Sequence, residues 1–394
     1  MTRLWEKGLP LDQRVLAFTA GEDHRLDARL VPYDVLGCVA HAEMLAAQDL
    51  ITDQDCKAIC DGLRKLEQGF ADGEWEIRLE DEDVHTALES RLTELIGPAG
   101  GRLHLGRSRN DQVLTALRLY SLDAIDAVSE NIGGLCQSLS GLAAREGDTA
   151  LPGFTHMQHA MPSSVALWSE GFIEAFEDDA AGLQASRRRL GKNPLGSAAG
   201  YGTPGLAIDR ELTTAKLGFD ETQVPVTAVQ LSRGKAENGL LFELTLLVQD
   251  LGRLASDLLL FYTQEFAYIE LAPEVTTGSS IMPQKRNPDV LELIRASSAT
   301  SQACLEECLM ITAKLPSGYQ RDLQRLKSPL FRSIDLAIEC VDIMSHILKG
   351  LKFRPENIRL DESINAAREA NELASRENIP FREAYRRVAE RYNK

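Results

Sequence analysis

Long stretches of helical periodicity constrain the fold of this chain more than any other feature. The segment LLFELTLLVQDLGRLASDLLLFY is apolar on more than one face, as expected of a helix surrounded by other helices. Helices about twice as long as the ordinary mean of roughly eleven or twelve residues need lateral partners. The pattern therefore predicts a helical bundle completed by further copies of the chain. Apolar residues recur at helical spacing over five segments, 110–145, 163–189, 231–271, 290–314 and 321–349.

The remaining sequence divides the chain, which has 394 residues, into three parts. Shorter helical patterns precede the first long segment, so we expect an N-terminal helical domain over 1–100. The long segments then form a central bundle domain over 101–350. After Phe353 the composition becomes polar, which predicts a small C-terminal helical domain over 351–394. The expected fold class is all-α.

The charge of the chain excludes some classes of partner. The formal net charge is −16, which argues against nonspecific binding to nucleic acid and against attraction to anionic membranes. The first residues, MTRLWEKGLP, contain no apolar signal core, and no uncharged run approaches a membrane span. We therefore expect a cytoplasmic protein. A small site can still be locally cationic and bind an anionic substrate.

The cysteines indicate free thiols and no metal site. Seven cysteines are an odd number, and no secretory segment accompanies them. Cys56 and Cys60 are four residues apart, and so are Cys304 and Cys308, which places each pair on one helix face. No histidine or paired CxxC completes a set of metal ligands.

The segment 278–289, GSSIMPQKRNPD, combines hydroxyls, two cations, two amides and two prolines between long helical patterns. Glycine and proline place these polar groups on a loop. A serine becomes a useful base only where cations and donors stabilise its alkoxide. Lys285 and the helix start after Pro288 could stabilise that charge on Ser279. The alternative is a solvated loop with ordinary turn chemistry.

A second polar cluster, HLGRSRNDQV over 104–113, directly precedes a long helix. Arg107, Arg109 and Asn110 could bind a dicarboxylate between them. The alternative is structural, because Asn110 or Asp111 could cap the helix.

A third polar cluster, PGFTHMQHAMP over 152–162, lies between prolines. A lone histidine is more often structural than catalytic. The neighbouring Thr155 and Gln158 favour a functional His156. We expect His159 to support the site or to be structural.

Two further segments allow alternative interpretations. In LPSGYQRDLQRLK, a helix would place Gln324 and Lys327 on one face, and spacing alone favours a solvated face. The stretch NPLGSAAGYGTPG over 193–205 is either a connector or a wall of backbone N–H groups that binds a carboxylate. It lacks the ending of a phosphate loop.

Taken together, these motifs resemble a known family. GSSIMPQKRNP resembles the signature loop of the fumarase/aspartase superfamily. Gln284 within it, together with GRSRNDQV, FTHMQ and LPSGYQRDLQ, resembles the argininosuccinate lyases and the related δ-crystallins. DEDVHTALESRL over 81–92 is similar to that family's N-terminal region. The motifs follow the family's order over nearly the whole chain.

The resemblance implies a three-domain fumarase/aspartase-like fold with a long central five-helix bundle. Four such bundles form the twenty-helix core of a homotetramer, and each active site combines polar clusters from three subunits. The family binds small molecules and needs neither a metal nor an organic cofactor. We expect none here, and neither a nucleic acid nor a membrane as partner.

The reaction implied by the resemblance is the reversible β-elimination of argininosuccinate to fumarate and L-arginine, the last step of arginine biosynthesis. A base removes a proton next to a carboxylate, and the C–N bond then breaks. The carbanion spreads its charge onto that carboxylate, so preorganised cations and donors must stabilise it.

The resemblance also implies roles for individual residues. Ser279 would take the proton, Lys285 and Asn287 would stabilise the charge, and His156 would act near the departing nitrogen. Which of Ser279 and His156 carries each proton stays open. The expected catalytic residues are Ser279, His156, Lys285, Thr155, Asn287 and Glu292, the last orienting His156. Substrate binding is expected at Arg107, Ser108, Arg109, Asn110, Thr155, Gln158, Ser280, Met282, Tyr319, Gln324 and Lys327.

Two departures from the family pattern leave alternatives open. An ungapped alignment places Asp23, in FTAGEDHRLD, where the family has the serine of an FNAS-type segment. A carboxylate there would alter how a substrate amino or carboxylate group is held. The C-terminal domain is also short for the family. A superfamily lyase that releases fumarate from another N-substituted aspartate is therefore one alternative, and a catalytically silent crystallin-like protein is another.

Overall fold

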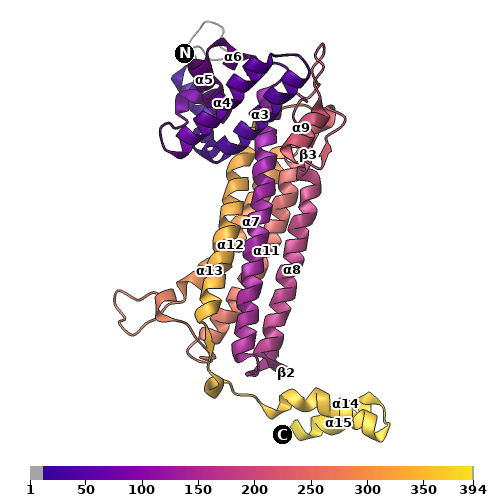
Figure 1. Cartoon of the computed structure of the whole chain (residues 1–394). Helices are drawn as coiled ribbons and strands as arrows, with labels where there is room; N and C mark the ends of the chain where they lie inside the picture. The colour runs from indigo at the N-terminus through magenta and orange to yellow at the C-terminus, as the bar shows by residue number, and fades with distance from the viewer. Residues whose placement is uncertain (1–11, 393–394) are drawn as a thin grey trace. The chain divides into compact units, whose positions relative to one another are not determined.

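The computed structural model describes residues 12–392, and 71% of the structure is helical (Figure 1). This confirms the all-α prediction. The α-helices are α1 Gln13–Ala20, α2 Asp23–Leu26, α3 Val31–Ala47, α4 Asp53–Ala71, α5 Val84–Ile96, α6 Pro98–Gly101, α7 Arg109–Glu146, α8 Val165–Leu190, α9 Arg210–Leu217, α10 Thr227–Ser232, α11 Lys235–Tyr262, α12 Asp289–Thr312, α13 Lys327–Gly350, α14 Ala366–Glu377 and α15 Phe381–Tyr392.

The strands of the described chain are short and form two-stranded sheets. The pairs are β1 Ala150–Thr155 with β2 Gln158–Ser164, antiparallel, β3 Lys192–Asn193 with β4 Glu221–Thr222, parallel, and β5 Ile269–Glu270 with β6 Lys352–Phe353, antiparallel.

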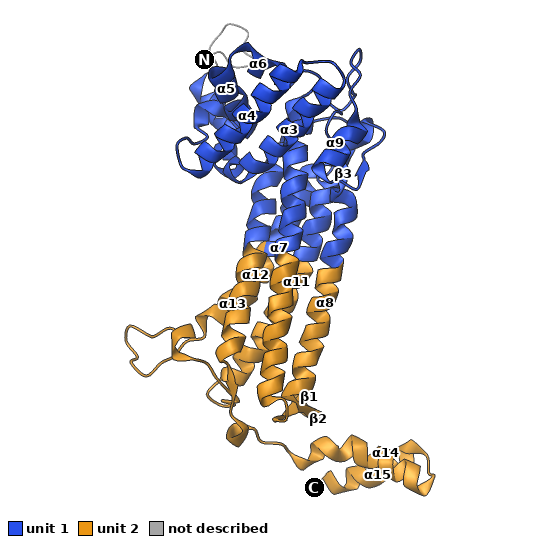
Figure 2. Ribbon diagram, in the orientation of Figure 1, with its two compact units in different colours: residues 1–127, 182–244, 301–335 blue, residues 128–181, 245–300, 336–394 orange. Residues whose placement is uncertain are grey.

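The chain divides into two compact units (Figure 2). Unit 1 comprises residues 1–127, 182–244 and 301–335, and unit 2 comprises residues 128–181, 245–300 and 336–394. The division falls inside α7, α8, α11, α12 and α13, so each of these helices contributes residues to both units. The three-domain division expected from the sequence stays a prediction.

Two helices of unit 1, α4 and α5, begin at side-chain caps. Thr52 accepts a hydrogen bond from the Asp55 N–H at 3.1 Å and starts α4, and Asp83 accepts one from the Thr86 N–H at 2.9 Å and starts α5. α4 and α5 then approach closely at Gly62, where an added Cβ would lie 2.7 Å from Leu92.

Adjacent long helices contact one another in each unit. In unit 1, Arg187 of α8 pairs with Asp126 of α7 at 2.6 Å. In unit 2, the Trp168 indole of α8 donates to Asp257 of α11 at 3.0 Å. Seven leucines of α11 are almost fully buried, as the apolar pattern around this helix predicted: Leu240, Leu241, Leu244, Leu247, Leu251, Leu254 and Leu258.

The third long helix is shorter than predicted. The segment 231–271 contains the end of α10, a break and α11, because Gly234 has φ +78° and Arg233 is extended. At the other end, Ala267 has φ +47° and turns the chain toward β5. Hydrophobic periodicity could not show these breaks, since the buried positions continue across them.

The fifth long helix also begins later than predicted. Residues Arg321–Leu326 form a 3₁₀ helix, η5, and α13 begins at Lys327. Pro329 explains this boundary, because its ring would clash with the carbonyl of Arg325 if the α-helix extended backwards. Gln324 therefore lies on the 3₁₀ helix and Lys327 on α13.

One segment of the described chain, Asp23–Ala47, has the length and mean hydropathy of a membrane span, 25 residues and 1.2. Within it, 61% of the most apolar window is buried, and a buried core helix passes the same test. The first ten residues, on which the absence of a signal core was argued, lie outside the described residues.

We predict that Gly234→Ala lowers the free energy of unfolding by about 2 kcal/mol or more. Its φ is +78°, and an added Cβ would lie 2.1 Å from the Thr312 methyl group. Chemical denaturation gives the measurement. The matched control is Gly133→Ala on α7, where nothing lies within 4 Å of the added Cβ. This control should be neutral or stabilise by up to about 1 kcal/mol, and equal effects would contradict the explanation.

Candidate active site

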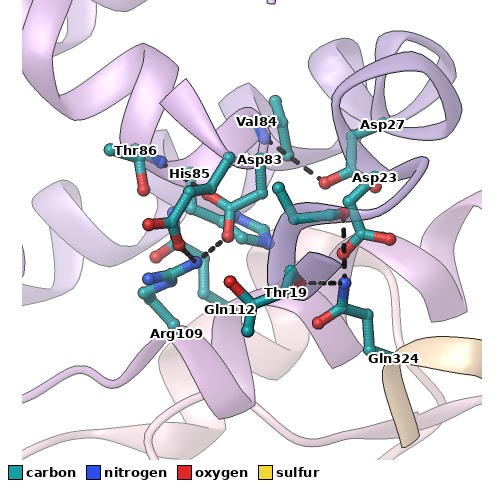
Figure 3. Close-up of polar contacts among 12 residues, drawn as sticks. Thr19, Asp23, Asp27, Asp83, Val84, His85, Thr86, Arg109, Gln112 and Gln324 are labelled. Carbon is teal, nitrogen blue, oxygen red and sulfur yellow. Dashed lines mark hydrogen bonds and ion pairs between the residues drawn. The ribbon is translucent and has the colours of Figure 1, made fainter. Parts of the chain in front are cut away.

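Unit 1 contains a cavity of about 390 Å³ with a strongly charged wall. Figure 3 shows part of this wall. The lining residues all belong to unit 1, and they are Asp23, Asp83, His85, His104, Ser108, Arg109, Asn110, Val113, Arg233, Tyr319, Arg321, Gln324 and Lys327. Six of the residues predicted to bind substrate therefore share one cavity: Ser108, Arg109, Asn110, Tyr319, Gln324 and Lys327.

The start of α7 brings three of these residues to the cavity. The Ser108 hydroxyl accepts the Asn110 N–H at 3.3 Å, and Asp111 accepts the Ser108 N–H at 3.0 Å. Ser108 therefore caps the helix, with Asp111 returning from the first turn, as in a capping box. The capping interpretation of Asn110 is wrong, and Asn110 lines the cavity.

The glycine-rich stretch 193–205 binds a carboxylate of the protein itself. The N–H groups of Gly196 and Ala198 donate to the second Asp111 oxygen at 2.9 and 2.8 Å. The stretch thus supplies backbone donors, but these two hold an internal carboxylate, and binding of a ligand carboxylate stays a prediction. Burial raises the pKa of Asp111 to about 6, although these donors oppose the shift. Asp111 thus joins the start of α7 to a distant loop.

Arg109 faces the cavity in partnership with two acids. Its guanidinium forms a short ion pair with Asp83 and contacts Glu82 at 3.5 Å. Burial opposes the ionisation of Asp83, but the charges of His85 and Arg109 outweigh it and lower its pKa to about 2. Asp83 and Arg109 thus neutralise one another in the wall.

Arg107 lies behind the cavity, outside its lining. Its side chain is 7% exposed and donates to the Cys38 sulfur at 3.0 Å. Three residues were predicted to bind a dicarboxylate between them. Of these, Arg109 and Asn110 line the cavity in unit 1, and Arg107 does not.

Lys327 is held by two carboxylates. Its ammonium lies 2.6 Å from Asp27 and 2.7 Å from Asp23. Lys327 is 2% exposed, so the solvated-face interpretation is wrong for this residue. Burial opposes its charge, yet Asp27 and Asp23 raise its pKa. Burial raises the pKa of Asp23 to about 6, against the opposing effect of Lys327 and with the help of Asp27.

The segment around η5 supplies the rest of the wall. Gln324 and Arg321 both donate to the Thr19 carbonyl, at 2.9 and 3.0 Å. The Arg233 guanidinium lies 5.7 Å from the centre of the Tyr319 ring. Within the part of the chain that the structure describes, neither Arg233 nor Arg321 forms a direct ion pair. Arg233 is buried and the charge of Glu237 acts on it, so Arg321 is the cation that remains for an anionic ligand.

The third polar cluster, which contains His156, belongs to unit 2 and lies at the turn of the β1–β2 hairpin. Thr155 pairs with Gln158, and the two residues between them, His156 and Met157, have φ +52° and +61°. All four side chains are exposed. His159, expected to be structural or supporting, packs edge to face on Phe154 with ring centres 5.0 Å apart.

The segment 278–289 also belongs to unit 2 and is a loop, as predicted. The Ser279 hydroxyl accepts the Met282 N–H at 3.2 Å. The Asn287 backbone exchanges hydrogen bonds with Thr277, and its side chain donates to the Gly278 carbonyl at 3.2 Å. Four predicted site residues of this region are exposed, namely Ser280, Met282, Lys285 and Glu292, the last in the first turn of α12.

Several residues that line the cavity were not predicted from the sequence as site residues. His85 and His104 line the wall, and so do Asp83 and Arg233. The segment DEDVHTALESRL carried a signal, because it places acids and a histidine directly before an apolar helical pattern. Arg233 is an isolated arginine in the sequence, and only the break between α10 and α11 brings it to the wall.

A family model described as Lyase matches residues 8–301. A protein of Sorangium cellulosum named argininosuccinate lyase is 42% identical over 389 residues, which cover 98% of this chain and 90% of the relative. The chain belongs to the argininosuccinate lyase family. A second argininosuccinate lyase, from Thermotoga neapolitana, is 39% identical over all of this chain and 98% of its own length. The family resemblance and the expected class, a lyase enzyme, are therefore confirmed.

Solved structures of other lyases share the fold. An EDDS lyase solved in complex with formate has a TM-score of 0.81 and 26% identity, covering 95% of this chain and 74% of that one. A class II fumarase of Schistosoma mansoni has a TM-score of 0.77 over 97% and 93% of the two chains, at 18% identity. The fumarase-like helical fold predicted for an argininosuccinate lyase is thus confirmed.

We predict that the stability contributed by His85 depends on pH. His85 lies 3.0 Å from Asp34, and this acid raises its pKa although burial opposes the shift. Its contribution should be fully present below the ordinary pKa of 6.5 and be lost as the pH rises through the raised value. The difference in unfolding free energy between the wild type and His85→Gln should therefore shrink on going from about pH 6 to pH 9. A constant or growing difference would contradict the pairing.

Proposed function

We propose that this protein catalyses the reversible β-elimination of argininosuccinate to fumarate and L-arginine. Two findings support the proposal together. Relatives about 40% identical over nearly their full length are named argininosuccinate lyase. The cavity of unit 1 also offers Arg321, which forms no ion pair in the described chain, and the buried Arg233 for the carboxylates of such a substrate. The charge of the cavity wall carries the proposal.

The chemical step needs a base and a field of donors. In the proposed mechanism the Ser279 alkoxide removes the proton next to the carboxylate that becomes part of fumarate. Lys285 and Asn287 stabilise the resulting dianion. His156 acts as acid–base partner at the departing nitrogen, oriented by Glu292, and Thr155 binds substrate. The Ser279 hydroxyl already accepts backbone N–H groups, at 3.2 Å from Met282 and 3.4 Å from Ile281, and such donors favour a charged oxygen.

Substrate binding is proposed for the remaining predicted residues. Arg109, Asn110 and Ser108 would position a carboxylate at the start of α7, where the helix dipole also favours negative charge. Tyr319, Gln324 and Lys327 would contact the amine end. The exposed loop and hairpin residues Gln158, Ser280 and Met282 would close over the substrate, and Arg107 would support Arg109 from behind.

We also propose that four copies assemble and that each site combines residues of three of them. The candidate catalytic residues belong to unit 2, and the candidate binding residues of the cavity belong to unit 1. Large apolar side chains remain exposed on the long helices of the isolated chain, as expected before burial in an assembly. They include Leu167, Phe242, Leu246, Leu293, Leu309 and Met310. We place the enzyme in the cytoplasm.

A second candidate function has an observation of its own. Asp23 adds a carboxylate to the cavity wall, and the EDDS lyase shares the fold at 26% identity. A lyase that releases fumarate from another N-substituted aspartate would also fit. Fumarate absorbance with purified protein distinguishes the candidates: product from argininosuccinate supports the first, and product only from another aminosuccinate supports the second. Absence of product from every aminosuccinate would indicate a silent, crystallin-like protein.

We predict that Ser279→Ala lowers kcat with argininosuccinate by at least about 1,000-fold, because the proposed base is removed. Substrate binding, measured by calorimetry, should be retained. The control is Ser298→Ala on α12, whose hydroxyl bonds the Arg295 carbonyl at 2.9 Å and belongs to no predicted site. This variant should keep near-normal turnover. Near-normal turnover of Ser279→Ala would exclude the proposed role.

A mixture of two inactive variants tests whether sites are shared. Ser279→Ala and His156→Asn should each be inactive alone. After co-refolding, some assembled sites would draw the intact Ser279 and the intact His156 from different chains, so fumarate production should return in part. Verified mixed assemblies without activity would contradict shared sites, whatever the substrate is.

A further inference from the structure

The two carboxylates around Lys327 differ in their access to the cavity. Asp27 has a fully buried side chain, and it also accepts the Val84 N–H at 3.3 Å. Asp23 keeps 12% of its side chain exposed and lines the cavity. Figure 3 labels both Asp23 and Gln324, which line the same cavity. Asp27 therefore neutralises Lys327 within the protein, and Asp23 is a second negative charge that faces the ligand space.

Most charges of the wall have a partner of opposite sign. Arg109 pairs with both Asp83 and Glu82, and Asp27 neutralises Lys327. Three groups then remain: the Arg321 cation, which forms no ion pair in the described chain, the buried Arg233, on which the charge of Glu237 acts, and the Asp23 carboxylate. Cations and an acid in one small cavity are the complement of a ligand that carries both a carboxylate and an ammonium group.

The lyase reaction proposed above supplies such a ligand. Its amine product is an α-amino acid, whose zwitterionic end carries one carboxylate and one ammonium group. The charge of a buried carboxylate such as Asp23 is only partly balanced by its neighbours. A cation that enters the cavity is attracted to it strongly, because the low dielectric constant of the wall strengthens the interaction.

We propose that Asp23 determines specificity by accepting the α-ammonium group of the amine product, so that the site selects an α-amino acid over an amine without that group. This inference rests on the proposed function, since it concerns the same site. It assigns Asp23 to the recognition of the amine and gives it no role in proton transfer.

The protonation behaviour of Asp23 supports this assignment. The charged groups that face it are Lys327, Asp27, Asp83 and Arg233. Burial, with Asp27 and Asp83, raises the pKa of Asp23 to about 6, while Lys327 opposes the shift. Asp23 is therefore ionised near neutral pH and becomes neutral in mildly acidic solution, where it would no longer attract a cation.

The test measures the reverse of the elimination, in which the enzyme joins fumarate to one of two amines. L-Arginine carries the α-ammonium group, and 5-guanidinopentanoate lacks it but keeps the guanidinium and the carboxylate. We expect Asp23→Asn to raise KM for L-arginine about tenfold or more, with kcat changed less than about threefold. The constant for the analogue, measured as KM or as an inhibition constant, should not change. The preference for L-arginine should thus collapse.

Asp27→Asn is the matched control. It removes the other carboxylate on Lys327 by the same chemical change, but Asp27 does not line the cavity. A purely structural disturbance of Lys327 should weaken both amines by the same factor and leave their ratio unchanged. Equal weakening of both amines by Asp23→Asn, or no change in either, would overturn the inference.

A measurement on the wild type keeps the inference testable if a variant does not fold. KM for L-arginine should rise about tenfold as the pH falls from 7 to 5, since Asp23 becomes protonated, and the analogue should not follow. A parallel change for both amines would overturn the inference. If the wild type makes no fumarate from argininosuccinate, the proposed function fails. If it does so while the ratio of amines is insensitive to Asp23, only the role of Asp23 fails.

Discussion

The cavity of unit 1 depends on a buried ammonium group. Lys327 begins α13, and its two carboxylate partners lie on α2 and on the 3₁₀ helix η1 (Asp27–Leu30), about three hundred positions earlier in the chain. A lysine stays charged in such an environment only because acids compensate for the loss of water. The trio therefore fixes the N-terminal segment against the start of α13, and the walls that carry Gln324, Arg321 and Asp23 follow from this contact. A similar connection operates at Asp111, where one carboxylate holds both a helix start and a glycine-rich loop.

In both connections a buried charged group is held by partners within the protein, and the same kind of pairing shapes the cavity wall. Neutralised pairs such as Arg109–Asp83 give the wall rigid polar groups with little net charge. Arg321 forms no ion pair in the described chain, and it is the cation that we propose attracts an anionic substrate. The net charge of −16 is therefore compatible with an anionic substrate, because the local arrangement of cations, and not the total, decides what this cavity binds.

The long helices could be predicted from the sequence because periodic apolar residues report burial directly. α7, α8 and α12 begin and end within a few residues of the prediction. The errors occurred where backbone geometry, and not hydrophobicity, ends an element: Gly234 interrupts one apolar run, and Pro329 restricts the start of α13. The candidate site was predicted in part for a related reason. Motif residues such as Asn110 and Tyr319 stand out as polar groups between helices, whereas His85, Asp83 and Arg233 reach the cavity only through tertiary packing. The burial of Lys327 could not be read from its spacing, since its partners are far away in the sequence.

The hairpin that carries His156 has a thermodynamic consequence. Two successive residues other than glycine, His156 and Met157, adopt left-handed backbone conformations in its turn. Asparagine and glycine favour such a two-residue turn, and larger side chains make it less favourable by about 1 kcal/mol each. A chain optimised only for folding would place Asn-Gly at this tip. The histidine and methionine present here make the hairpin less stable than an Asn-Gly turn would. The stability of the hairpin and the proposed role of His156 therefore place opposite demands on the same turn.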